Sequence, residues 1–165
     1  MHARPKASIE LRFTPNVELV SDVRKFISVF YEQVLGDAEA ASRLALTTHE
    51  LLENVVKYST DGETRTCLDV EYLPKPRVTI RTYNRTSPDN VAALERLFGD
   101  MKSTGDPSAY YLQVAHAAAR GPVSKSGLGL ARICAEADMI LELEVLPDGI
   151  MIQAHVDLDD LEGAA

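Results

Sequence analysis

Residues 46–59 read LTTHELLENVVKYS, and this stretch carries charged and amide side chains one helical turn apart. At about 100° per residue, Glu50 and Asn54 lie on the same face of a helix, with Thr47 and Lys57 beside them. Apolar residues fill the remaining arc, which is wide enough for a helix that packs on a sheet: Leu44, Ala45, Leu51, Leu52, Val55 and Val56. The stretch therefore predicts a helix with an apolar face and a polar stripe.

The polar stripe combines three kinds of chemistry on one face. Glu50 supplies a carboxylate that can accept a proton, Asn54 an amide oxygen for a hard metal ion, and Lys57 an ammonium group for phosphate. A magnesium nucleotide suits such a set. The simpler alternative is that these side chains face water on an amphipathic helix. The stripe alone leaves both interpretations open.

Composition and charge describe an ordinary globular chain. The 165 residues are 45% hydrophobic and 25% charged, which predicts one domain over residues 1–165 with its core in 7–158. The net charge of -8 argues against a nucleic-acid or membrane-surface partner. The sequence shows neither the apolar run of a signal peptide nor the roughly 20 apolar residues of a membrane helix. A cytoplasmic location is the expectation.

Hydrophobic periodicity predicts alternating strands and helices in the first half of the chain. Apolar side chains recur at every second residue in the expected strands and at helical spacing in the expected helices. Gly36 stands where the first helix needs a C-cap, and Asp37 can cap the second. The predicted elements are a strand at 7–13, a helix at 17–35, a second helix ending near Ser59, and a hairpin of strands at 64–72 and 77–83.

The second strand of this hairpin carries polar residues on its apolar face. By parity, Thr82 and Asn84 share the face of Val78 and Ile80, so they are expected to point inward. Polar residues at the end of a buried strand face often border a pocket. The alternative is that the strand simply ends there and runs into a turn.

The second half of the chain contains a glycine-containing segment before a helix. The predicted elements are helices at 91–101 and 108–119, a mobile break at 102–107, a loop at 121–130 that feeds a helix, and a hairpin of strands at 139–146 and 150–156. In the loop, Lys125 and Ser126 precede Gly127, Leu128 and Gly129. Glycines permit close backbone approach, and the start of a helix attracts an anion such as phosphate. A plain tight turn is the alternative.

The order of these elements and motifs resembles the Bergerat-fold (GHKL) ATP-binding domain shared by gyrase and histidine kinases. Within that superfamily the chain is most similar to the small bacterial anti-sigma factor serine/threonine kinases. The likeness implies an α+β fold, a two-layer sandwich whose mixed, mostly antiparallel sheet is covered on one face by helices. Residues 50–58 match the family's N box, residues 126–130 match its last glycine motif, and residues 99–125 take the place of the ATP lid.

The resemblance also implies roles for individual residues. Asn54 would coordinate Mg²⁺, Glu50 would be the general base for the attacking hydroxyl, and Lys57 would lie near the phosphates of ATP. The segment from Lys125 through Ser126, Gly127 and Leu128 to Gly129 would contact the phosphates at the start of its helix.

One family motif is absent from the sequence. The strand that normally runs into Asp-x-Gly-x-Gly ends here with Thr82 or Asn84 at the position of the aspartate, and neither glycine is present. In the family this aspartate accepts a hydrogen bond from adenine, so its loss would cost roughly 1.5–3 kcal/mol. The site is then expected to bind ATP weakly, to choose another base, or to be empty.

Two functions follow from the resemblance and from this departure. The first is a Mg-ATP-dependent serine/threonine protein kinase that acts on a small STAS-type partner in a bacterial regulatory switch, with homodimer formation as a further expectation. The alternative is a non-catalytic switch protein that binds its partner and retains a degenerate nucleotide pocket.

Overall fold

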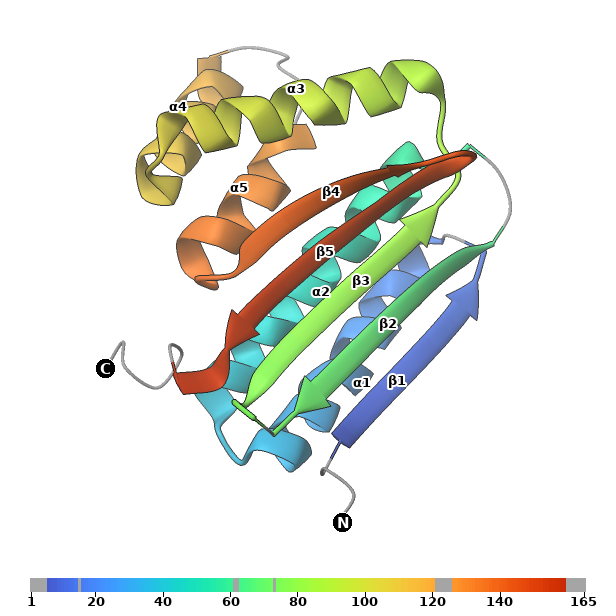
Figure 1. The fold of residues 1–165 in the computed structure, drawn as a ribbon, viewed down its shortest axis with the longest axis vertical. Coiled ribbons are helices and arrows are strands. Elements are labelled where there is room, and N and C mark those ends of the chain that lie inside the picture. Colours follow the sequence, from blue (N-terminus) through green and yellow to red (C-terminus); the bar gives the residue numbers. More distant parts are fainter. Residues whose placement is uncertain (1–5, 15, 61–62, 73, 121–125, 160–165) are drawn as a thin grey trace.

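The protein forms two layers, a five-stranded sheet and a set of helices on one of its faces (Figure 1). The computed structural model describes residues 6–14, 16–60, 63–72, 74–120 and 126–159. Within them the strand order is β1-β2-β3-β5-β4. The strands are β1 (Lys6–Phe13), β2 (Thr64–Glu71), β3 (Arg77–Asn84), β4 (Ile140–Leu146) and β5 (Gly149–Asp157). The predicted α+β sandwich is confirmed.

The sheet differs from the expected mixed sheet in one respect. Every strand pair among the described residues is antiparallel. The reason lies in the C-terminal hairpin, where the turn at residues 147–148 brings β5 back between β4 and β3. Strand β5 therefore separates β4 from β3, and the prediction of a mixed sheet was wrong for this part of the chain.

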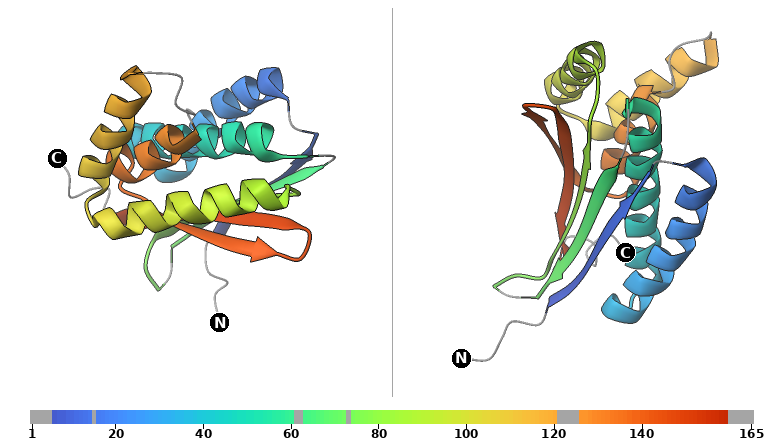
Figure 2. Two further views of the ribbon diagram at one scale, coloured as in Figure 1. Left: turned by 90° about the horizontal axis from the view of Figure 1, so that it is seen from above. Right: turned by 90° about the vertical axis from the view of Figure 1, so that its right-hand side faces the viewer.

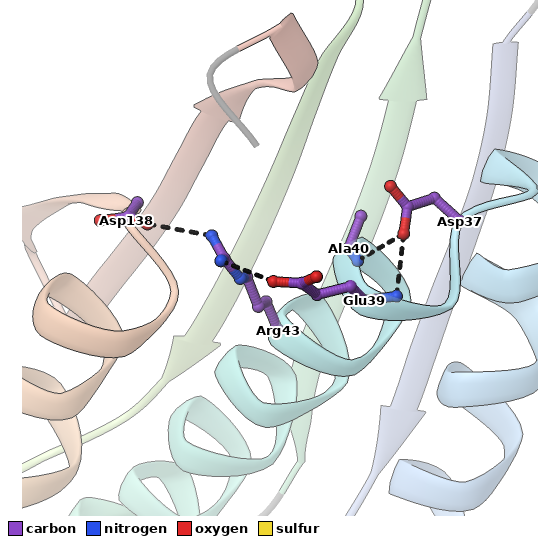
Figure 3. Close-up of polar contacts among 5 residues, drawn as sticks. All are labelled: Asp37, Glu39, Ala40, Arg43 and Asp138. Carbon is purple, nitrogen blue, oxygen red and sulfur yellow. Dashed lines mark hydrogen bonds and ion pairs between the residues drawn. The ribbon is translucent and has the colours of Figure 1, made fainter. Parts of the chain in front are cut away.

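Five helices cover the sheet in the described part of the chain, and capping residues mark the ends of several of them. They are α1 (Val17–Leu35), α2 (Ala38–Tyr58), α3 (Pro88–Thr104), α4 (Pro107–Arg120) and α5 (Ser126–Glu136). Gly36 ends α1 in the left-handed conformation, with φ of 72°. The Asp37 carboxylate then accepts hydrogen bonds from the backbone N–H groups of Glu39 and Ala40 at 2.8 and 3.0 Å (Figure 3). The predicted joint between these two helices is confirmed.

The predicted break at residues 102–107 is shorter in the structure. Helix α3 continues to Thr104, and Gly105 ends it with φ of 71°. The Asp106 carboxylate accepts hydrogen bonds from the N–H groups of Ser108 and Ala109, so α4 begins at once. Two capping signals close together thus produce a tight corner. Figures 1 and 2 show α3 and α4 at one end of the molecule, near α5 and β4.

The core lies between the sheet and helix α2. Along β3, burial alternates as predicted, with Val78, Ile80, Thr82 and Asn84 buried toward the helices. Helix α2 presents Leu44, Leu51, Leu52 and Val55 as buried apolar residues. No helix in the described residues is both long enough and apolar enough to cross a membrane.

Candidate functional site

The polar stripe of α2 is largely covered. The side chain of Glu50 is 12% exposed and Asn54 is 8% exposed, whereas Lys57 is exposed. The alternative that all three face water is therefore wrong for Glu50 and Asn54. Thr47 is buried, and its hydroxyl donates a hydrogen bond to the Arg43 carbonyl at 3.1 Å. The hydroxyl therefore has its partner within the same helix.

Three helices enclose a cavity of about 250 Å³ at this stripe. Helix α2 contributes Glu50, Asn54 and Lys57 to its wall, and α5 contributes Gly129. The remaining lining residues are Val17, Val20, Glu53 and Val56. The structure thus brings the N-box residues and part of the last glycine motif to one place. The chemical roles assigned to them stay predictions.

The Glu50 carboxylate has a counter-ion that the sequence analysis missed. Nη1 of Arg132, on α5, lies 3.3 Å from Oε1 of Glu50. Burial raises the pKa of Glu50 and the nearby Glu53 carboxylate adds to the rise, while Arg132 and His49 oppose it. A signal for Arg132 was present, because it lies three residues after Gly129 and thus on the same face of α5.

Asn54 has an amide group with unused hydrogen-bonding capacity. Among the described residues, its buried Nδ2 atom has no hydrogen-bond partner. Buried polar atoms are nearly always satisfied, so an orphaned amide beside a cavity is typical of a site that receives a ligand or an ordered water. Because the amide oxygen and nitrogen are assigned from their surroundings, Asn54 can present either atom to the cavity.

The glycine motif lies inside helix α5 and not in a loop before it. The helix begins at Ser126, so Gly127, Leu128 and Gly129 form its first turn. Gly127 is buried, and a Cβ there would approach Cδ1 of Leu97 to 2.7 Å. The glycines thus allow close packing of α5, while the first N–H groups of the helix still lack acceptors within it. Lys125 and the side chain of Ser126 lie outside the described residues.

The end of strand β3 is separate from this cavity. Thr82 is 1% exposed and Asn84 is 7% exposed, both beneath the helices. Nδ2 of Asn84 donates to the Arg85 carbonyl at 3.2 Å. Asn84 lines a different cavity of about 490 Å³, together with Arg12, Arg65 and Tyr83. The structure therefore does not bring Thr82 and Asn84 together with Glu50.

Comparisons with known proteins give a similarity of fold. The sequence matches no protein-family profile and no curated protein. Among solved structures, it is similar to a chain in the crystal structure of the SiaB–SiaC complex from Pseudomonas aeruginosa, with a TM-score of 0.66 and 14% sequence identity. The match covers 90% of this chain and 89% of that one. At this identity the shared property is the helix-covered sheet, and membership of the Bergerat-fold superfamily stays a proposal.

Proposed function

We propose that this chain is a regulatory switch protein that binds a small partner protein and phosphorylates it on serine or threonine with Mg-ATP. The observation that supports the proposal is the meeting of Glu50, Asn54, Lys57 and Gly129 around one cavity, although they come from two helices. A similar fold occurs in the SiaB–SiaC complex, a structure that contains two different proteins. A STAS-type partner and pairing of two copies belong to the proposal as expectations of the resemblance, and a cytoplasmic location belongs to it as an expectation from the sequence.

The proposed phosphate end of the site uses residues of both helices. Asn54 lines the cavity and would hold Mg²⁺ through its amide oxygen. When bound, Mg²⁺ neutralises charge on the transferred phosphate. Lys57 and the first N–H groups of α5, from Ser126 to Gly129, would contact the phosphate oxygens, with Lys125 as a further cation.

Glu50 is proposed as the general base that takes the proton of the acceptor hydroxyl. Burial raises its pKa above the ordinary value of 4.5, which increases the basicity of the carboxylate. Its carboxylate borders the same cavity as Asn54. A hydroxyl group that enters this cavity would therefore meet a proton acceptor beside the proposed metal position.

A second function is favoured by the separation of the end of β3 from the cavity at Glu50. The cavity of about 250 Å³ is smaller than the roughly 300–1,000 Å³ of most ligand pockets. Thr82 and Asn84 are buried away from it, so the position of the family's adenine-binding aspartate does not open into the cavity. A non-catalytic switch protein that binds its partner without nucleotide is the candidate that this observation supports.

Calorimetry of Mg-ATP binding separates the two functions. The wild-type protein is titrated beside Asn54→Ala, with Asn90→Ala as a matched control, because Asn90 lies on α3 and bonds to the Tyr58 carbonyl outside the cavity. The kinase proposal expects binding that Asn54→Ala weakens at least tenfold and that Asn90→Ala retains. Partner binding in the absence of any nucleotide binding would contradict the kinase and support the non-catalytic switch.

A further inference from the structure

Helices α2 and α5 pack closely against each other at Glu50 and Gly129. A Cβ atom at position 129 would overlap Oε2 of Glu50 and lie 3.4 Å from its Cδ. Real Cβ atoms do not approach a carboxylate that closely, so a side chain at residue 129 would displace the Glu50 carboxylate from its present position. Gly127, two residues earlier, faces Leu97 and Val114 instead. The two glycines of the motif therefore serve different neighbours.

Arg132 holds the other oxygen of the same carboxylate. Its Nη1 atom lies 3.3 Å from Oε1 of Glu50, and its Nε donates to Oε2 of Glu136 at 2.8 Å. The bond to Glu136, one turn along α5, fixes the guanidinium on its own helix. The Arg132 side chain is 41% exposed and that of Glu50 is 12% exposed, so the arginine is partly hydrated while it neutralises a nearly buried charge.

We propose that Gly129 and Arg132 position the Glu50 carboxylate at the edge of the cavity. We call their two contacts with the carboxylate oxygens the carboxylate seat. Gly129 provides the space for one carboxylate oxygen and Arg132 binds the other, so the side chain is restricted to one orientation. The catalytic part of this inference rests on the proposed kinase function, in which Gly129 and Arg132 act through Glu50 as positioning residues. The seat itself is a packing arrangement that exists whether or not the protein transfers phosphate.

Thermal denaturation of a double-mutant cycle tests the seat without reference to activity. Gly129→Ala should lower the melting temperature, because the added methyl group collides with Glu50. Adding Glu50→Ala removes the colliding carboxylate, so the double variant should melt about 3 °C or more above the value expected from the sum of the single changes.

Gly127→Ala is the matched control for this cycle, since it makes the same change on the same helix against Leu97. Its effect should add to that of Glu50→Ala. Additive effects at position 129, or equal coupling at both glycines, would overturn the seat.

Kinetics of phosphate transfer test the positioning role. Gly129→Ala and Arg132→Met should each lower kcat by roughly 10- to 100-fold, since a displacement of about 1 Å at a catalytic group can cost two orders of magnitude. In Arg132→Met the KM for ATP should change less than about threefold, because Arg132 is inferred to act on the base and not on the phosphates.

Arg132→Lys retains the positive charge and should recover part of the lost kcat. Unchanged kcat in both Gly129→Ala and Arg132→Met would overturn the positioning role. If the wild-type protein transfers no phosphate, the proposed function fails, and the denaturation cycle still decides the seat.

Discussion

The two ends of the expected nucleotide site differ in how the fold treats their polar residues. At the crossing of α2 and α5, Glu50 and Asn54 border a cavity. At the end of β3, Thr82 and Asn84 are buried outside that cavity, and Asn84 donates to a neighbouring backbone carbonyl. Polar residues on an inward strand face can be satisfied by the backbone around them, whereas those on α2 lie beside a gap between helices. Inward direction alone therefore does not identify a binding residue.

The largest expected effect concerns the crossing of α2 and α5, where Glu50 and Asn54 border the cavity. Glu50→Gln should lower phosphate transfer to the partner protein by roughly 10²- to 10⁴-fold, because the amide cannot accept the hydroxyl proton. Transfer of labelled phosphate from Mg-ATP measures the effect. Glu39→Gln is the control, since Glu39 lies on the same helix, is largely exposed and pairs with Arg43 away from the cavity. Equal rates for Glu50→Gln and wild type would contradict the role of base.

The end of β3 is tested by placing an aspartate at position 82, where the family motif would have one. Thr82→Asp should lower the free energy of unfolding by about 3 kcal/mol or more, because it buries a carboxylate at a site that is 1% exposed. Urea denaturation measures the loss. Thr82→Val, which keeps the shape and removes the hydroxyl, should stay within about 1.5 kcal/mol of wild type. A stable Thr82→Asp variant that binds Mg-ATP more tightly would show that the two ends share one pocket.

The cavity requires that α5 stay packed in the fold. The alkylation rate of the Cys134 thiol on α5 measures this packing. Burial raises the pKa of this thiol from 9.0 to about 11, so less of it is thiolate at any given pH. At pH 8 its alkylation should be about 100-fold slower than that of an ordinary thiol, since two pKa units reduce the thiolate fraction by that factor. Mass spectrometry after timed iodoacetamide treatment measures the rate. A rate equal to that of an unfolded control would show that α5 leaves the sheet in solution.

The pH dependence of catalysis tests the environment of the Glu50 carboxylate. Because burial raises the pKa of Glu50 above 4.5, the carboxylate takes up a proton at a higher pH than an exposed glutamate does. A general base works in its ionised form. The value of kcat/KM should therefore be at its maximum above this raised pKa and should decline as the pH falls through it. An acid limb at or below the ordinary glutamate value would contradict the buried environment of Glu50.

The smallest expected effect concerns a contact that links α2 to the turn after α5. Figure 3 shows Arg43 between Glu39 and Asp138, with 3.0 Å from its Nη1 to the Asp138 carboxylate. Asp138→Asn should cost less than about 1 kcal/mol, because the Asp138 side chain is 55% exposed and surface ion pairs contribute little. Urea denaturation checks this value. A loss of 2 kcal/mol or more would mean that this contact helps to hold the helices around the cavity.

Local signals in the sequence predicted most of the fold. Gly36 and Asp37 fixed the joint between α1 and α2, and alternation placed the inward face of β3, because these features depend on neighbouring residues only. The sheet order was less accessible, since the return of β5 between β3 and β4 depends on long-range pairing.

The site was predictable only in part. The spacing of Glu50 and Asn54 places them together on one face, as the structure shows. Arg132 was missed because it meets Glu50 across 82 positions of sequence. The glycines are ambiguous by nature, since a missing side chain permits either a ligand or a packed neighbour, and the structure shows packed neighbours at both Gly127 and Gly129.

The distance in sequence between Glu50 and Arg132 has a consequence for synthesis of the protein. A chain leaves the ribosome at roughly 5–20 residues per second, so α2 emerges several seconds before the arginine that neutralises its acid. During that interval the Glu50 carboxylate lacks the counter-ion that it has in the folded protein. The cavity therefore cannot be complete until α5 has been synthesised.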